Sequence, residues 1–134
     1  MHRAELVTRL EDLLRQEPDG LIAVYLYGSR ARDTARDDSD VDLGVLYTEP
    51  PARRFGGPPD RLAESLEREL RTEVQVVVLN DAPADLVHRV LRDGVLVLET
   101  DRSARIRFEV AKRNEYFDLL PILRRYRRLE VSAS

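Results

Sequence analysis

Apolar residues recur along this chain at two different spacings, and the spacings predict a mixture of strands and helices. Short runs rich in β-branched and aromatic residues predict strands at residues 21–27, 41–47, 74–79 and 95–99. Leucines and valines at helical spacing predict helices at residues 4–17, 60–71, 82–93 and 101–120. The alternation of the two kinds of element predicts an α/β domain.

Residues at the ends of these segments predict where the helices begin. Ser29 is expected to cap a short helix over residues 29–35, Asp60 to cap the helix at 60–71, and Asn80 or Asp81 to cap the next one. Gly94 is expected to end that helix in the C′ position. Between the second strand and Asp60, residues 49–59 contain four prolines and two glycines and predict a loop.

The last third of the chain is expected to pack through its apolar residues. Within the helix at 101–120, the predicted packing positions are Ile106, Phe108, Val110, Phe117 and Leu120. Pro121 either kinks this helix or begins a separate last helix. That segment has Ile122, Leu123, Tyr126 and Leu129 beside four arginines, so it either packs through its apolar side or binds an acidic partner or nucleic acid. Residues 131–134 are expected to be a disordered tail.

The 134 residues predict one domain, with a core but no separate substrate domain. The chain has no apolar run long enough to span a membrane, and its charged N-terminus does not read as a signal peptide. The absence of cysteine fits a cytoplasmic location. A net charge of −3 argues against general nucleic-acid binding, although residues 101–134 carry 9 basic and 5 acidic side chains.

Two carboxylates mark the start of the second predicted strand. Asp40 and Asp42 are two residues apart, so a strand projects both to the same side. Two like charges at this distance are unfavourable unless a cation lies between them, and Mg²⁺ prefers such oxygens while leaving positions open for phosphate. Asp42 also interrupts an apolar strand, which an acidic surface turn does not explain. The pair therefore predicts a magnesium site.

The first strand ends at Gly28 and Ser29, where a turn into a helix presents backbone N–H groups and a hydroxyl to an anion. These two residues are the predicted phosphate contacts. Arg30 and Arg32 follow them and either touch the phosphates of a nucleotide or form a solvated face. A phosphate-binding turn opposite a carboxylate pair that holds a metal ion is typical of enzymes that transfer phosphoryl or nucleotidyl groups.

A calcium-binding loop of the EF-hand kind is a weaker interpretation of the same acidic cluster. Counted from Asp38, carboxylates stand at the first, third, fifth and twelfth positions. However, Leu43 occupies the position that requires glycine, and the prolines at 50 and 51 exclude the helix that should follow.

Gly28-Ser29, ten intervening residues and then Asp40-x-Asp42 resemble the nucleotidyltransferase superfamily that includes DNA polymerase β. The segments Gly28–Arg32 and Ser39–Leu43, together with residues 79–83, resemble its minimal nucleotidyltransferase (MNT) branch. The resemblance implies a palm-like α+β fold, with a mixed four-stranded sheet flanked by helices. It also implies Gly28, Ser29 and Arg30 as nucleotide contacts, and Asp40 and Asp42 as catalytic ligands of Mg²⁺.

MNT proteins are commonly antitoxins that transfer AMP from ATP to a tyrosine of a HEPN-domain toxin. The resemblance therefore implies a protein adenylyltransferase, with ATP as substrate and Mg²⁺ as cofactor, in a complex with such a toxin.

This sequence departs from the family at the third predicted strand. Family members place a third carboxylate there, where this chain has Gln75, and glutamine is no base near neutral pH. Glu73 stands two residues earlier, on the same face if the strand extends that far, and is a candidate substitute. Two alternatives to an active adenylyltransferase therefore stay open. One is a weakened or inactive antitoxin that acts by contact, and the other is a small-molecule nucleotidyltransferase of the antibiotic-modifying kind.

Overall fold

The computed structural model describes residues 1–17, 20–32, 39–52 and 54–133, with the side chains of 131–133 excepted. Its elements, in chain order, are α1 (Arg3–Leu14), β1 (Leu21–Tyr27), β2 (Val41–Tyr47), α2 (Pro58–Leu70), β3 (Val74–Val78), α3 (Ala84–Asp93), β4 (Val95–Glu99) and α4 (Arg102–Ala133). All four predicted strands are present, and the bounds of β1, β2 and β4 match the prediction.

The four strands form one mixed sheet in the order β3-β2-β1-β4. β1 runs antiparallel to both of its neighbours, while β2 and β3 pair in parallel through the connection that contains α2. This topology confirms the expected mixed sheet. Since β1 and β2 are antiparallel neighbours, the end of β1 lies beside the start of β2, which is where the predicted site residues are found.

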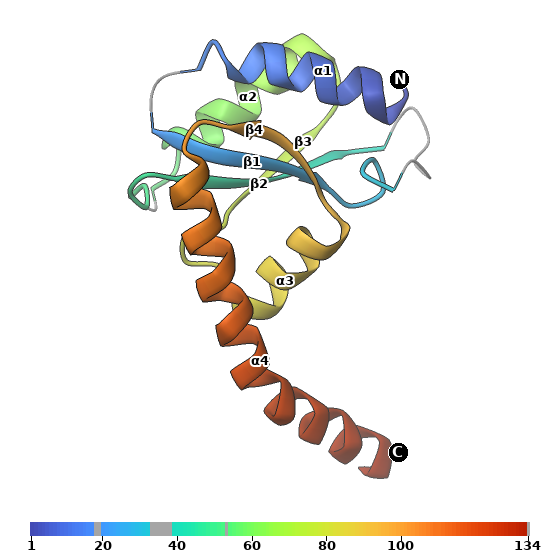
Figure 1. Cartoon of the computed structure of the whole chain (residues 1–134). Helices are drawn as coiled ribbons and strands as arrows, with labels where there is room; N and C mark the ends of the chain where they lie inside the picture. Colours follow the sequence, from blue (N-terminus) through green and yellow to red (C-terminus); the bar gives the residue numbers. More distant parts are fainter. Residues whose placement is uncertain (18–19, 33–38, 53, 134) are drawn as a thin grey trace.

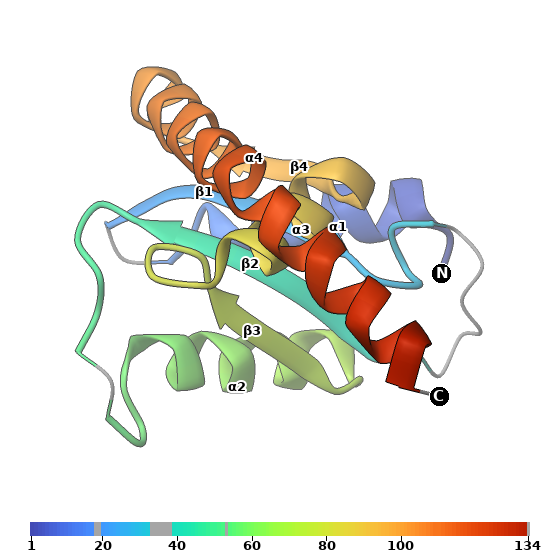
Figure 2. The same cartoon turned by 90° about the horizontal axis from the view of Figure 1, so that it is seen from below.

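Helices cover both faces of the sheet. Figure 1 shows α1 and α2 on one side and α3 and α4 on the other, and Figure 2 views the molecule from the side of α3 and α4. On the first side, leucines of the two helices, such as Leu10 of α1 and Leu66 of α2, share a core cluster with strand residues such as Val45 of β2. On the other side, Val87 and Val90 of α3 pack on Ala23 and Tyr25. The strands are therefore buried on both faces, which explains their nearly continuous apolar runs.

Two predicted helix caps are wrong, because both side chains bond elsewhere. α2 begins after Gly57 with Pro58 in its first position, and Asp60 lies in the first turn, where its carboxylate accepts a hydrogen bond from the N–H of Gly56 at 2.8 Å. α3 has Pro83 in the N-cap position, so neither Asn80 nor Asp81 caps it. Asn80 instead bonds to both backbone groups of Tyr47 at 2.8 and 2.9 Å. Asn80 thus extends the hydrogen bonding at the end of β2.

Gly94 ends α3 as predicted, but for a different reason. Its backbone is extended (φ −82°, ψ 164°) and not left-handed. A Cβ there would collide with the carbonyl oxygen of Val90 and lie 3.1 Å from that of Leu26. Gly94 is therefore needed where the end of α3 comes close to β1.

α4 is one continuous helix, so the alternative of a separate last helix after Pro121 is wrong. It extends through Ala133, beyond the start of the predicted disordered tail, while Ser134 lies outside the described residues. The first half of α4 packs on the body, and its second half projects away from it (Figure 1). Of the predicted packing positions, Phe108 and Leu120 are half-buried, but Ile106, Val110 and Phe117 are exposed.

Within the described ranges, no helix is both long and apolar enough to cross a membrane.

Candidate nucleotidyl-transfer site

Tyr27 at the end of β1 and Asp42 near the start of β2 are direct partners across the antiparallel pair. In the parallel pair, Asp42 is in turn the partner of Gln75. Since partners across a sheet project to the same face, Tyr27, Asp42 and Gln75 form a row across three strands. Tyr27 borders the core under α3 and α4, so the row belongs to that side of the sheet.

Gly28 follows this row with a left-handed backbone (φ +75°). A Cβ at this position would collide with a carboxylate oxygen of Asp42 and lie 3.3 Å from its Cγ. Only glycine satisfies both conditions, because other residues are strained at positive φ and would displace the carboxylate. The predicted phosphate turn and the predicted metal ligand are therefore in direct contact.

Asp40 directly precedes β2 and is close enough to Asp42 for its charge to act on that carboxyl, while its projection to the same side as Asp42 stays a prediction. Asp40 is exposed and Asp42 half-buried. Burial, and then the negative charge of Asp40, raise the pKa of the Asp42 carboxyl above its ordinary value. A cation bound between the two carboxylates would relieve both effects.

The turn after Gly28 is stabilised by hydrogen bonds between its own backbone groups. The carbonyl oxygen of Gly28 accepts hydrogen bonds from the N–H groups of Ala31 and Arg32 at 3.2 and 3.4 Å. Residues 29–32 form a turn, not the start of the predicted helix, and the rest of the predicted range, residues 33–35, lies outside the described residues. Ser29, an expected phosphate contact, is partly exposed and directly follows Gly28.

Arg30 is buried, with only 7% of its surface exposed. Its Nε and Nη2 donate to the carbonyl oxygen of Ser39, at 3.0 and 2.8 Å. Arg30 thus links the turn after β1 to Ser39, the residue before Asp40. These bonds help to hold the expected phosphate-binding turn near the carboxylate pair. A phosphate contact by Arg30 or by the exposed Arg32 stays a prediction.

The position of the expected third carboxylate is occupied by the exposed Gln75. Its Nε2 donates to the carboxylate of Glu73 at 2.7 Å, so the two side chains lie on the same side. β3 begins at Val74, but the carbonyl of Glu73 still accepts a hydrogen bond from the N–H of Val41 at 2.9 Å. Glu73 is therefore placed beside the row, as the expected substitute requires.

Two residues near the site were not predicted from the sequence. The pKa of Tyr27 is raised by burial and by the charge of Asp42, and lowered by Arg89 of α3. Tyr27 could have been recognised from strand alternation, because it directly precedes Gly28. Arg89 had no such signal, since only the packing of α3 over the sheet brings it near.

His88 of α3 contacts an aromatic ring of the next helix. Its ring stacks on that of Tyr116 of α4, with centroids 3.7 Å apart and planes 3° from parallel. This stack joins the two helices on that side of the sheet.

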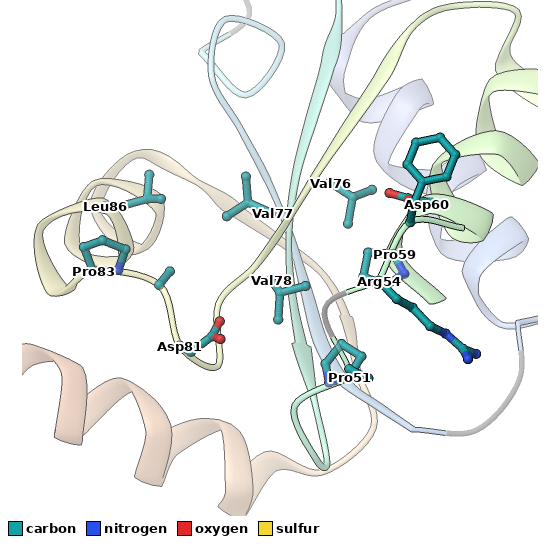
Figure 3. Close-up of a pocket in the computed structure, with 13 residues that line it drawn as sticks. Pro51, Arg54, Pro59, Asp60, Val76, Val77, Val78, Asp81, Pro83 and Leu86 are labelled. Atoms are coloured by element: carbon teal, nitrogen blue, oxygen red, sulfur yellow. The ribbon is translucent and has the colours of Figure 1, made fainter. Parts of the chain in front are cut away.

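An apolar pocket of about 610 Å³ lies across the free edge of β3, away from the carboxylates. In Figure 3, Val76 and Val78 point to one side of the strand and Val77 to the other, with Asp81, Pro83 and Leu86 on the side of Val77. None of the predicted site residues lines it. The pocket is thus separate from the row of Tyr27, Asp42 and Gln75.

The carboxylate pair suits Mg²⁺, which needs few protein ligands, better than it suits a metal ion whose ligands all come from the protein. Among the described residues, no group of three or more histidine, cysteine or acidic side chains forms a metal cage. Mg²⁺ is typically bound by one or two carboxylates together with substrate phosphates, and Asp40 and Asp42 supply that number.

The sequence profile of the family described as Polymerase beta, Nucleotidyltransferase matches residues 8–103, which is most of the chain. This range includes the whole row and the turn at Gly28. A chain of a structure designated a minimal nucleotidyltransferase is 31% identical, with a TM-score of 0.53, and covers 71% of this chain and 95% of its own length. No curated protein matches this chain.

Longer structural matches extend over α4. One chain of a toxin–antitoxin crystal structure with AMP-PNP has a TM-score of 0.75 at 24% identity, covering 96% of this chain and 98% of its own. A chain of the complex of tri-AMPylated Shewanella oneidensis HEPN toxin with MNT antitoxin has a TM-score of 0.71 at 22% identity, covering 98% and 99%. At these identities the matches show a shared fold.

Proposed function

Because this chain belongs to the polymerase β-like nucleotidyltransferase family, we propose that it transfers AMP from ATP to a hydroxyl group of a partner protein. One observation carries the proposal: the carboxylate of Asp42 lies against the turn at Gly28, and Asp40 is close enough for its charge to act on that carboxylate. This contact brings a metal ligand to the place where a nucleotide phosphate would bind.

Each residue of the site has a distinct part in this reaction. Gly28 and Ser29 hold the β- and γ-phosphates, and Arg30 keeps the turn against Ser39. Asp40 and Asp42 hold Mg²⁺, which when bound neutralises charge on the α-phosphate and on the leaving group. Tyr27 lies beside Asp42 on the neighbouring strand.

In the transfer step, the acceptor hydroxyl oxygen forms a bond to the α-phosphorus. The bond between that phosphorus and the oxygen bridging to the β-phosphate breaks, and pyrophosphate leaves with the bonding pair. The hydroxyl proton must pass to a base. Gln75 cannot accept it, whereas the carboxylate of Glu73, held 2.7 Å from the amide of Gln75, can.

The proposed acceptor is a tyrosine of a cognate HEPN-type toxin, which makes this chain an antitoxin. Support comes from the fold shared with chains of toxin–antitoxin structures, one of them with a tri-AMPylated toxin and another with AMP-PNP.

A second candidate is an antitoxin that neutralises its partner by contact, without transfer. Gln75 favours it, because the amide removes the expected base while leaving the metal pair in place.

The two candidates are separated by one assay. The chain is incubated with ATP, Mg²⁺ and the protein encoded by the neighbouring gene, and both proteins are weighed as intact masses. A gain of one or more AMP units on the neighbour, lost with Asp42→Asn, supports the transferase. A stable complex without added mass supports the contact-only antitoxin, and neither complex nor transfer contradicts both.

A further inference from the structure

β3 is an end strand of the sheet, so one of its edges has no neighbouring strand in the order β3-β2-β1-β4. Its pairing with β2 is bounded by two hydrogen bonds, from the N–H of Val41 to the carbonyl of Glu73 at 2.9 Å and from the N–H of Leu79 to the carbonyl of Val45 at 2.8 Å. In a parallel pair of this register, the odd-numbered residues of β3 bond to β2. The N–H and C=O groups of residues 74, 76 and 78 therefore point to the free edge.

This edge is closed at its start and open further along. The outward N–H of Val74 donates to the carboxylate of Glu67 of α2 at 3.0 Å. By contrast, the outward N–H and C=O groups of Val76 and Val78 make no hydrogen bond to any other described residue. The two valines are about 6.6 Å apart along the strand, which is the two-residue repeat of an extended chain. We call Val76 and Val78 the open edge of β3.

The open edge belongs to the lining of the apolar pocket of about 610 Å³. One wall of the pocket comes from the loop between β2 and α2 and from the first turn of α2. The other wall comes from the loop before α3 and from the first turn of α3. Figure 3 shows Val76 and Val78 on the side of Pro59 and Val77 on the side of Pro83. The pocket thus offers apolar surface on both faces of β3 together with open backbone groups at its edge.

Two properties of the pocket define the occupant that fits it. Backbone donors and acceptors at strand spacing match those of another extended chain, and apolar walls on both faces match side chains that alternate between the faces. Charge adds little selectivity, because the lining includes Arg54 as well as Asp60 and Asp81. The complementary occupant is therefore an extended protein segment with apolar side chains on both faces.

A second copy of this chain is a poor occupant of the open edge. Paired strands lie about 4.8 Å apart, and the β3 strand of a second copy lies between the same two walls. Pairing of β3 with β3 would therefore press the walls of the two copies against each other. Pairing of β3 with β4, the other end strand, is a head-to-tail contact that builds rings or filaments. An extended segment of a different protein has neither restriction.

We propose that the open edge of β3 is the docking surface for an extended segment of the partner protein, which adds a strand to the sheet. The proposal rests on the proposed function for the identity of that partner, the acceptor of AMP. The row of Tyr27, Asp42 and Gln75 is not part of the pocket lining. Docking of the segment and transfer of AMP are therefore separable events.

Hydrogen exchange of single amides, followed by NMR, tests strand addition directly. In the free protein, the amide of Val77 is expected to exchange at least about tenfold more slowly than those of Val76 and Val78, because only Val77 donates to β2. Addition of the purified neighbouring-gene protein is expected to slow exchange at Val76 and Val78 at least about tenfold, and to change Val77 less. A complex without slower exchange at the open edge overturns the proposal, as does the absence of any complex.

A matched pair of substitutions at Val78 tests the same contact through affinity. Val78→Pro removes the outward N–H without removing a hydrogen bond to β2, which is the position where an edge strand accepts proline. Val78→Ala also shortens the side chain but keeps the N–H. Circular dichroism checks that both variants fold, and calorimetry with the neighbouring-gene protein measures affinity.

We expect Val78→Pro to bind the partner at least about tenfold more weakly than Val78→Ala does. Equal affinities of the two folded variants overturn the proposal. If Val78→Pro does not fold, the exchange measurement on the wild type decides. Wild-type oligomers that grow with concentration and are abolished by Val78→Pro, seen by light scattering without partner, overturn the proposal in favour of a second copy.

Transfer measurements keep this proposal apart from the proposed function. Asp42→Asn is expected to retain partner affinity and lose transfer. Val78→Pro is expected to raise the partner concentration at half-maximal transfer while leaving the maximal rate within about twofold. If the wild type transfers no AMP but Val78→Pro still loses affinity, the docking surface stands and the transferase proposal fails. If transfer occurs and both Val78 variants bind equally, the transferase stands and the docking surface fails.

Discussion

Gly28 and Asp42 come from neighbouring strands and lie so close that Gly28 has no room for a Cβ beside the Asp42 carboxylate. Two independent requirements therefore fall on one residue: a backbone with φ +75° and an empty side-chain position. The contact joins the residue expected to bind phosphate to the residue expected to bind metal.

Gly28→Ala is expected to reduce both stability and nucleotide binding. The matched control is Gly56→Ala, because Gly56 has nearly the same backbone (φ +76°) with nothing within 4 Å of the new Cβ. Each substitution carries a backbone cost of about 1 kcal/mol, and Gly28→Ala adds about 1–3 kcal/mol of steric strain against Asp42. Urea denaturation and ATP titration measure the two effects. Equal losses in the two variants would show that Asp42 does not crowd this turn.

Asp42→Asn is expected to stabilise the metal-free protein at neutral pH. The folded-state pKa of Asp42 lies above its ordinary value of 3.8, so the folded state favours the protonated form. That contribution to stability is present below about pH 3.8 and is lost as the pH rises through the raised pKa. Removing the charge should therefore raise Tm at pH 7, and the gain should shrink towards pH 3.

Magnesium should reverse the order of the two proteins. The ion is expected to raise Tm of the wild type and not of Asp42→Asn, because binding to the folded state alone adds stability. The control is Asp12→Asn at an exposed position of α1, expected to change the free energy of unfolding by less than about 0.5 kcal/mol. An equal response of wild type and Asp42→Asn to Mg²⁺ would remove Asp42 from the metal site.

Gln75→Asp is expected to increase AMP transfer at least about tenfold, because it places a base directly beside Asp42 in the parallel pair. The comparison is Glu73→Gln, which keeps the size of the side chain but removes the carboxylate that Gln75 now contacts. Single-turnover rates with saturating ATP and partner measure both. A Gln75→Asp rate equal to wild type, together with a large loss in Glu73→Gln, would identify Glu73 as the working base.

Tyr25→Phe is expected to destabilise the fold by about 1–2 kcal/mol. The buried Tyr25 hydroxyl donates to Glu109 at 2.6 Å, and Arg105 bridges Glu109 and Glu99 at 2.9 and 2.8 Å, so the change removes a bond between β1 and α4. Tyr126→Phe is the control, since Tyr126 is 66% exposed. Chemical denaturation measures the free energy of unfolding of both variants. Equal midpoints would show that the hydrogen bond from Tyr25 to Glu109 does not stabilise the fold.

The strands were predictable because each is mainly an apolar run, although Asp42 stands within β2 and Gln75 within β3. Asp42 was a candidate site residue because a carboxylate within such a run requires an explanation. Its proximity to Asp40 follows from strand geometry alone. The placement of Gln75 beside Asp42 needed the sheet order as well, which only the resemblance to a known family supplied.

Other features depended on competition between local and distant partners. Asp60 and Asn80 are good capping residues, but Asp60 bonds to Gly56 and Asn80 to Tyr47. The sequence also could not show that the guanidinium of Arg30, an expected phosphate contact, donates to the carbonyl of Ser39. Helical periodicity likewise identified an apolar side of α4 but not whether another element covers it, so Phe117 was assigned to the core.

Gly44 faces α3 two residues along β2 from Asp42, and a Cβ there would lie 3.2 Å from side-chain atoms of Leu79 and of Val90. The lack of a Cβ at Gly44 thus allows α3 to pack at its observed distance from the sheet. Arg89, the neighbour of Val90, is held by the same helix close enough to Tyr27 for its charge to act on the Tyr27 hydroxyl. Core packing at Gly44 therefore sets how far α3 lies from the proposed nucleotide site. A substitution of an apolar core residue could change that distance without any change in the polar residues of the site.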